Sequence, residues 1–244
     1  MNGEHILYCE NLGKRFGGVV AVKDVSIHLN KGEILGLIGA NGAGKTTLFN
    51  MVSGVFRPTS GKIIFKDTEI QRLPPHRICR MGIGRTYQIV QPFTNFTLLD
   101  NVLSGALMRC PIVSDAREIA EGIIEMLGIS HLRNISGGAL TLIQLKRMEI
   151  ARALATEPQV LLLDEVMAGL NPTEREDLLV TVQRVKETGV SIIIIEHVMK
   201  VIMNLSDRVY VLNQGELIAE GLPHEVMNDP AVIKSYIGER KHAS

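Results

Sequence analysis

The chain has 244 residues, and 45% of them are hydrophobic, which is enough to bury the core of one large domain or of two small ones. Lysine and arginine number 26 together, as do aspartate and glutamate, so no net field favours nucleic acid or an anionic lipid surface. No basic leader with an apolar core opens the sequence, and no apolar run reaches the roughly 18 residues of a membrane span. We therefore expect a soluble, cytoplasmic chain that reaches a membrane only through a partner.

The first 30 residues predict an antiparallel β lobe. Residues 5–10 and 25–29 alternate in character as short strands do, and they precede a more apolar strand. Between them, Phe16 stands beside Gly17 and Gly18 rather than inside an apolar run. Phe16 could stack on a nucleobase, or it could be a core aromatic at the end of a strand.

Residues 39–47 read G-A-N-G-A-G-K-T-T and follow the apolar run 34–38. An apolar strand, a glycine-rich turn and a Lys-Thr-Thr that opens a helix form the sequence context of a P-loop. Backbone N–H groups there close round phosphate oxygens, and the helix N-terminus adds positive potential. Lys45 would reach the β- and γ-phosphates, Thr46 would offer its hydroxyl to Mg²⁺, and Thr47 could cap the helix or touch the α-phosphate. The predicted nucleotide-binding residues are Gly39, Asn41, Gly42, Ala43, Gly44, Lys45, Thr46 and Thr47.

The middle of the chain predicts a change from strands to helices. Residues 61–65 and 83–87 read as strands with a short helix between them, and Gln88 follows the second strand. Beyond it, apolar residues recur at helical spacing. We interpret residues 91–155 as an inserted helical subdomain.

A uniformly apolar segment, 160–163, predicts a strand buried on both faces, and it ends in Asp164 and Glu165. A hydrolytic nucleotide site needs carboxylates near the metal, so Asp164 is a candidate for holding Mg²⁺ and Glu165 for polarising the attacking water. Two acidic residues can also simply end a strand and cap a loop. The strand at 191–195 is followed by His197, and a lone histidine in that position is more often structural.

The remaining elements are helices over 173–186 and 198–205, a hairpin of 207–212 with 216–219, and two short helices within 223–237. Together these patterns predict an α/β fold with a RecA-like P-loop NTPase core, a mostly parallel sheet, the antiparallel β lobe and the helical insertion. The core and lobe would span 1–90 and 156–222, and 223–244 would add C-terminal helices and a tail.

The order and spacing of these motifs resemble an ATPase subunit of an ABC transporter over practically the whole chain. The motifs that carry the resemblance are Gly39 to Thr46, Gln88, Leu161 to Glu165, Ala168 to Pro172 and His197. Within that family the chain is most similar to the ATPases of branched-chain amino acid importers and their amide or urea relatives. The narrower similarity rests on Arg15 to Gly18, Gly84 to Gln88, Glu149 to Leu154, Ala168 to Pro172 and Tyr236 to Gly238.

The resemblance implies an enzyme that binds and hydrolyses ATP with Mg²⁺. It implies that Phe16 stacks on adenine and that Gln88 senses Mg²⁺ and the γ-phosphate and relays toward the membrane subunit. Asp164 would hold the metal together with Thr46 and Gln88. Glu165 would be the general base, and His197 would be a switch residue on the γ-phosphate.

The family's signature, commonly L-S-G-G-Q, has two candidate positions. Ser136-Gly137-Gly138 matches it by eye, but in the family the signature stands directly before the helix with the Ile-Ala-Arg-Ala-Leu run. Counting back from that run gives Leu140-Thr141-Leu142-Ile143-Gln144, where Thr141 keeps a hydroxyl and the usual glycines are Leu142 and Ile143. We therefore place the signature at Thr141 and Gln144, and expect function with somewhat weaker dimer closure.

The resemblance also implies partners. The chain would form a head-to-tail dimer with a second ABC ATPase subunit, the same or a paralogous chain, around two ATP molecules. The dimer would drive transmembrane permease subunits from the inner face of the cell membrane, and indirectly serve a solute-binding protein, without contacting nucleic acid.

Two other classes of function fit the sequence less well. A soluble ABC ATPase acting on ribosomes or DNA would resemble tandem cassettes or carry long coiled-coil insertions, which this sequence lacks. A P-loop GTPase would need an Asn-Lys-x-Asp motif, and the pair Asn30-Lys31 is followed by Gly-Glu.

The segment from Gln88 to Asp100 is the expected permease contact, because an exposed apolar cluster usually marks a partner surface. Its apolar residues are Ile89, Val90, Pro92, Phe93 and Phe96. They could instead fill the core of the helical subdomain.

Overall fold

A computed structural model describes residues 5–240 of the chain, with side chains up to residue 235. The chain divides into two compact units. Met1–Ile78 with Ser191–Ser244 form the first, which we call the P-loop unit, and Cys79–Val190 form the second, the helical unit. Residues 241–244, the end of the expected C-terminal tail, lie outside the described part.

Two sheets build the P-loop unit. The antiparallel sheet has the order β2-β1-β4-β5, which confirms the predicted lobe. Its strands are β1 (His5–Phe16), β2 (Val19–Asn30), β4 (Ser60–Phe65) and β5 (Thr68–Glu69). Both β1 and β2 run well beyond the predicted 5–10 and 25–29, because register shifts after Cys9 break the apolar and polar alternation while the two strands remain paired.

The second sheet of this unit has β3 (Ile34–Gly39) between two other strands, and all six residues of β3 are buried. β3 pairs in parallel with β8 (Ser191–Ile195) and with β9 (Arg208–Asn213), and β10 (Glu216–Gly221) pairs antiparallel with β9. A strand with parallel neighbours on both sides must be apolar throughout, as the sequence predicted.

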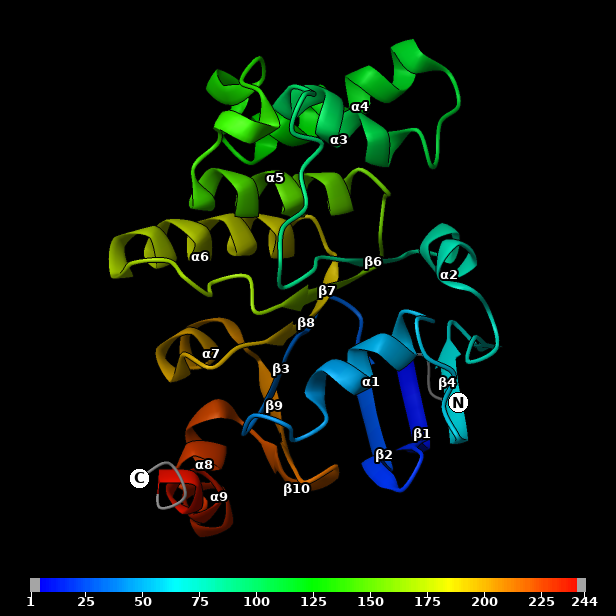
Figure 1. Cartoon of the computed structure of the whole chain (residues 1–244), viewed down its shortest axis with the longest axis vertical. Coiled ribbons are helices and arrows are strands. Elements are labelled where there is room, and N and C mark those ends of the chain that lie inside the picture. Colours follow the sequence, from blue (N-terminus) through cyan, green and yellow to red (C-terminus); the bar gives the residue numbers. More distant parts are fainter. Residues whose placement is uncertain (1–4, 241–244) are drawn as a thin grey trace. The chain divides into compact units, whose positions relative to one another are not determined.

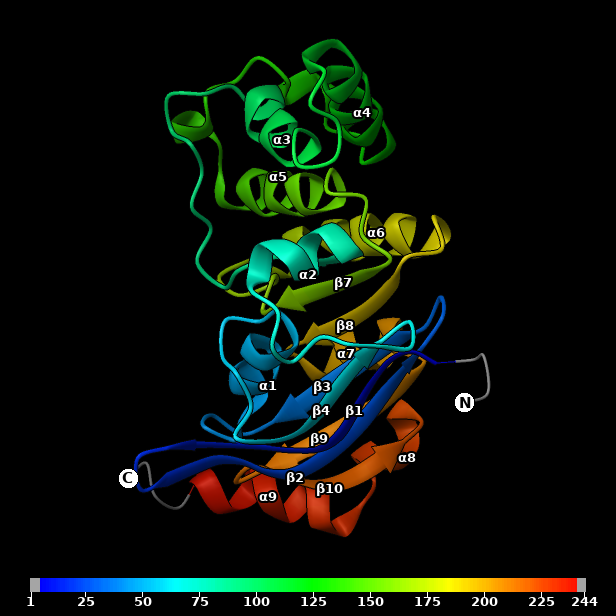
Figure 2. The same cartoon turned by 90° about the vertical axis from the view of Figure 1, so that its right-hand side faces the viewer.

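The helices of the P-loop unit cover these sheets. The unit contains α1 (Lys45–Val52), α7 (Met199–Leu205), α8 (Pro223–Met227) and α9 (Pro230–Arg240). α1 packs against β2 and β3, and α8 and α9 pack against β10 (Figure 2). α1 begins directly after the loop that follows β3.

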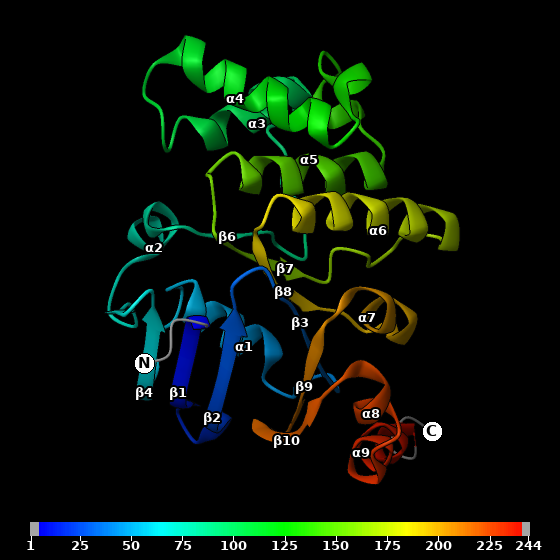
Figure 3. The ribbon, with the colours of Figure 1, turned by 180° about the vertical axis from the view of Figure 1, so that it is seen from behind.

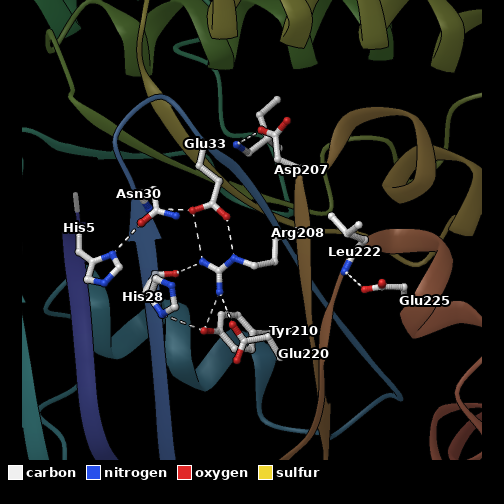
Figure 4. Close-up of polar contacts among 11 residues, drawn as sticks. His5, His28, Asn30, Glu33, Asp207, Arg208, Tyr210, Glu220, Leu222 and Glu225 are labelled. Carbon is white, nitrogen blue, oxygen red and sulfur yellow. Dashed lines mark hydrogen bonds and ion pairs between the residues drawn. The ribbon is translucent and has the colours of Figure 1, made fainter.

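Arg208, the first residue of β9, joins strands of both sheets (Figure 4). Its Nε and Nη2 donate to the two carboxylate oxygens of Glu33 at 2.8 and 3.2 Å. Nη2 also donates to the main-chain oxygen of His28, and Nη1 donates to the hydroxyl of Tyr210, each at 2.8 Å. Because His28 lies on β2, this guanidinium fixes the β lobe to the core strands.

The helical unit holds a parallel strand pair and a helix stack (Figures 1 and 3). Its elements are β6 (Ile83–Arg85), α3 (Leu98–Ala106), α4 (Val113–Met126), α5 (Leu142–Leu154), β7 (Val160–Asp164) and α6 (Pro172–Glu187), and α2 (Pro75–Met81) crosses the division. α3 packs on α4 and α5, and α5 lies beside α6. No helix among residues 5–240 is long and apolar enough to cross a membrane.

β6 ends two residues earlier than the predicted strand 83–87. The N–H of Tyr87 donates to a carboxylate oxygen of Glu149 at 2.9 Å instead of to a neighbouring strand. A side chain from a distant helix thus replaces the ladder partner, and no local sequence pattern announces that.

Candidate nucleotide site

The loop between β3 and α1 has the backbone that a phosphate site requires. Gly44 has φ +106° and Gly39 has φ +150°, both in the region that favours glycine. A Cβ on Gly44 would lie 2.5 Å from the main-chain oxygen of Ala21, and one on Gly39 would lie 2.1 Å from that of Leu212. Packing as well as conformation therefore demands glycine at both positions.

Lys45 and Thr46 open α1 at the end of this loop. The Lys45 ammonium donates to the main-chain oxygens of Gly39 and Ala40 at 2.7 and 2.8 Å, so the buried side chain lies across the loop. Thr46 is exposed in the first turn. The N–H groups of a first helical turn lack intrahelical acceptors, so this end of α1 favours an anion. The loop fits a chain of phosphates.

Phe16 ends β1 and is 43% exposed, so it is not a core aromatic. Its ring meets Phe56 edge-on, with centroids 5.2 Å apart, and the Lys14 ammonium lies 5.0 Å from the Phe16 centroid. The ring is held in place yet accessible. Stacking on adenine stays a prediction.

His197 follows β8, and its side chain is exposed. Ile195, at the end of β8, pairs with Leu37, which lies two residues before Gly39. Because parallel strands end at the same edge of a sheet, His197 and the phosphate loop leave the P-loop unit's sheet at the same level. That placement is compatible with a γ-phosphate contact.

Asp164 ends β7 in the helical unit and forms a buried ion pair. Its Oδ2 accepts from Nη2 of Arg85 at 2.8 Å, and the two side chains are 3% and 7% exposed. This role of Arg85 was not predicted from the sequence, although a buried arginine at the end of a strand needs a carboxylate partner. The carboxylate of Asp164 suits Mg²⁺, which prefers hard oxygen ligands.

Glu165 and Gln88, two predicted site residues, contact each other within the helical unit. Nε2 of Gln88 donates to Oε2 of Glu165 at 2.7 Å. Glu165 has φ +49°, a left-handed conformation that costs free energy in a residue with a side chain. Glu157 has the same φ, so the contact with Gln88 rather than the backbone conformation distinguishes Glu165.

Thr141 immediately precedes α5 and is exposed. Its N–H donates to Oε1 of Gln144 at 2.9 Å, one half of a capping box. Leu142 is 43% exposed. Thr141 and Leu142 are thus both exposed at the start of α5.

Ser136 precedes a short 3-10 helix, Gly137–Ala139, and the polar groups of residues 136–138 are bonded within the helical unit. The N–H of Gly137 donates to the oxygen of Phe96 at 2.8 Å, and that of Gly138 donates to the oxygen of Thr94 at 3.0 Å. The Ser136 hydroxyl also donates to the oxygen of Thr94. These groups already have acceptors.

The segment after Gln88 exposes much of its apolar surface. Ile89 is 76% exposed, Phe96 54% and Phe93 51%, so these three side chains do not fill the core of the helical unit. Val90 and Pro92 are half-buried.

Comparison with known families decides the identity of the fold. A family model described as "ABC transporter" matches residues 22–168, and one described as "Branched-chain amino acid ATP-binding cassette transporter" matches residues 216–242. The chain belongs to the ABC transporter family of ATPases. Because the first match spans more than half of the chain, this confirms the resemblance inferred from the motifs.

Relatives of this ABC ATPase match it over nearly its full length. It is 39% identical to the high-affinity branched-chain amino acid transport ATP-binding protein BraF of Pseudomonas aeruginosa, over 96% of this chain and 98% of BraF. It is equally identical, with the same coverage, to the LivG protein of Salmonella typhimurium, which bears the same description. The ADP conformation of MJ1267, an ATP-binding cassette of an ABC transporter, superimposes with a TM-score of 0.88 at 35% identity, over 96% of this chain and 99% of MJ1267. The predicted fold class is therefore confirmed.

Proposed function

We propose that this ABC ATPase binds and hydrolyses ATP to energise an importer of branched-chain amino acids or related small solutes. The observation that carries the proposal is the phosphate loop, whose glycines and Lys45 fit a phosphate chain in a protein similar end to end to such ATPases. The C-terminal match to the branched-chain family supports the solute class. The balanced charge of the chain gives no support to a nucleic-acid partner.

In this proposal Phe16 stacks on adenine, and the loop amides with Lys45 bind the phosphates. The hydroxyl of Thr46, the side chain of Gln88 and the carboxylate of Asp164 would hold Mg²⁺, because their oxygens are the ligands it prefers. When bound, Mg²⁺ neutralises charge on the phosphates. His197 would donate to the γ-phosphate.

Glu165 would take the proton of the attacking water. Its contact with the Gln88 amide orients the carboxylate, and one oxygen can accept the water proton while the other stays bonded to Gln88.

The chain would act as a dimer with a second ABC ATPase subunit, each ATP facing the partner's signature. Thr141 is the residue we assign to this contact, because a helix N-terminus with an exposed hydroxyl suits a γ-phosphate. The Ser136 loop suits a γ-phosphate contact less, because the N–H groups of Gly137 and Gly138 already donate to main-chain oxygens within the helical unit.

Transmembrane permease subunits would bind the exposed apolar side chains after Gln88, and would thereby place the chain on the inner face of the membrane. The exposure of Ile89, Phe93 and Phe96 supports this surface. A solute-binding protein would act on the permease rather than on this chain.

The test is Glu165→Gln, which keeps the shape of the side chain and removes its basicity. Hydrolysis should fall by about 10²–10⁴-fold while ATP binding persists, and ATP-bound dimers should accumulate in size-exclusion chromatography with Mg²⁺. Glu157→Gln is the matched control, because Glu157 has the same φ of +49° and no proposed role. A Glu165→Gln protein that hydrolyses ATP at the wild-type rate would overturn the assignment.

A further inference from the structure

Three charged side chains follow one face of α5 at a spacing of three residues. They are Lys146, Glu149 and Arg152, and residues three apart on a helix are surface neighbours. Lys146 is 2% exposed and Glu149 is 3% exposed. Burying a lysine and a glutamate costs free energy unless both are hydrogen-bonded, so their placement here requires partners.

Those partners are main-chain groups of the segment that follows β6. Oε1 of Glu149 accepts from the N–H of Tyr87 at 2.9 Å, and the Lys146 ammonium donates to the oxygen of Gln88 at 3.0 Å. The two bonds hold the Thr86–Tyr87 and Gln88–Ile89 peptide groups, which flank the Tyr87–Gln88 pair. The backbone from which the Gln88 side chain extends is therefore fixed by α5.

Arg152 extends the same attachment by one turn. It donates to the oxygen of Gln91 at 3.1 Å, and its guanidinium lies 5.9 Å from the ring centroid of Phe93. From Tyr87 to Gln91 the segment has no regular secondary structure, and side chains of α5 bond its main chain. Further along, Asn101 of α3 bonds the main chain of Phe93, and the N–H groups of Gly137 and Gly138 bond Phe96 and Thr94.

The Gln88 side chain carries the attachment onward to Glu165, to which it donates at 2.7 Å. A continuous set of contacts thus runs from Thr141 at the start of α5, through Lys146 and Glu149, to Gln88 and Glu165. Thr141 and Glu149 are eight residues apart, a helical rise of about 12 Å. Because Lys146 and Glu149 lie on the same helix as its N-terminus, a displacement of that end would move their side chains with it.

We propose that Lys146 and Glu149 are positioning residues for Gln88, and that through them the partner's ATP at Thr141 controls the orientation of Glu165. The inference rests on the proposed function, in which Thr141 meets the partner's nucleotide and Glu165 serves the chain's own. Its consequence is that the hydrolysis rate of one site depends on nucleotide at the other, and that this dependence requires the two α5 side chains.

The hydrogen-bond acceptor rather than the charge of Glu149 makes the link to Tyr87. Burial raises the pKa of Glu149, opposed by the Tyr87 N–H bond and by the charges of Arg152 and Lys146. A glutamine at this position retains a carbonyl oxygen, whereas an alanine does not. Glu149→Gln should therefore preserve what Glu149→Ala destroys.

The experiment compares these two variants in the full chain, by steady-state ATP hydrolysis and by hydrogen exchange of the peptide covering residues 86–92. Glu149→Ala should lower kcat at least tenfold, leave KM within twofold, reduce the Hill coefficient to one and accelerate exchange in this peptide. Glu149→Gln should stay within threefold of the wild type in all of these. Glu118→Ala, an exposed glutamate on α4, is the control for acidic-residue loss in the same unit.

Lys146→Met is the second variant, because it retains the aliphatic stem and removes the ammonium that donates to Gln88. It should reproduce the loss of kcat and cooperativity with an unchanged circular dichroism spectrum. A folded Lys146→Met protein with wild-type kcat and Hill coefficient overturns the proposal. If Glu149→Ala shows faster exchange with unchanged kcat, the positioning role is overturned and the proposed function is left intact. A wild-type chain without ATPase activity overturns both the positioning role and the proposed function.

Discussion

A substitution in the Glu33–Arg208 ion pair tests whether burial or interatomic distance determines how much an ion pair stabilises the fold. Glu33→Gln replaces two carboxylate oxygens by one carbonyl oxygen and one NH₂ group. Glu33 accepts three bonds, two from Arg208 and one from the N–H of Asn30 at 2.7 Å. The amide cannot satisfy all of them, and its NH₂ group must face a donor.

The magnitude follows from the exposure of the pair, 16% for Arg208 and 8% for Glu33. Removing one partner of a buried pair costs about 3–5 kcal/mol, and since Glu220 remains as a second carboxylate for Arg208 we take about 2–3 kcal/mol. For a chain of this size each kcal/mol lowers Tm by about 2–4 °C, so the expected shift is about 4–12 °C.

The assay is thermal and urea unfolding followed by circular dichroism, with Glu216→Gln as the control. Glu216 pairs with Lys23 at 2.5 Å, closer than either Arg208 contact to Glu33, but the two side chains are 51% and 66% exposed. Exposed pairs contribute little because water and salt screen them. Glu216→Gln should leave Tm unchanged, and an equal shift in both variants would refute the reasoning from burial.

Three further predictions concern binding, the signature and pH. Lys45→Ala should weaken ATP binding because it removes the positive charge from the phosphates, and calorimetry that finds unchanged affinity would count against the loop assignment. Thr141→Arg should abolish cooperative ATPase activity in the assembled transporter, and Ser136→Arg should affect it mildly. If Ser136→Arg has the larger effect, the Ser136 loop is the signature. Burial and a neighbouring arginine lower the pKa of His28 in the folded state, so the unfolded chain takes up the proton first and the free energy of unfolding falls as pH drops below about 6.5. His28→Gln should flatten the dependence of urea midpoint on pH between 7 and 5, and the exposed His131→Gln should not; equal slopes in the two variants would contradict the shift.

Local pattern sufficed for the elements that are buried on both faces or fixed by glycine. β3, the phosphate loop and β7 were all predicted, because an apolar run and a glycine-rich turn are properties of neighbouring residues. The lengths of β1 and β2 were not, since pairing continues through irregular register that alternation cannot detect. The early end of β6 was likewise invisible, because the acceptor of Tyr87 is 62 residues away.

In the candidate site, too, individual residues could be predicted from the sequence but their contacts could not. Glu165 and Gln88 could be named from the ends of their strands, but their contact joins residues 77 apart, and that of Arg85 with Asp164 joins residues 79 apart. Short-range pattern identifies the side chains that we propose for the chemistry. The fold identifies the side chains that contact them.

The unusual signature illustrates why that distinction matters for function. Leu142 stands where the family commonly has glycine, and from sequence a bulky side chain there predicts weaker dimer closure. In the structure a Cβ on Gly169 would lie 3.0 Å from Cδ2 of Leu142, so the leucine lies against the loop that follows Glu165 at a residue with no side chain and φ +81°. The leucine can therefore be accommodated while the start of α5 stays accessible. This contact also gives α5 a second attachment near Glu165, beside the one through Gln88, so both ends of the proposed pathway move with the same helix.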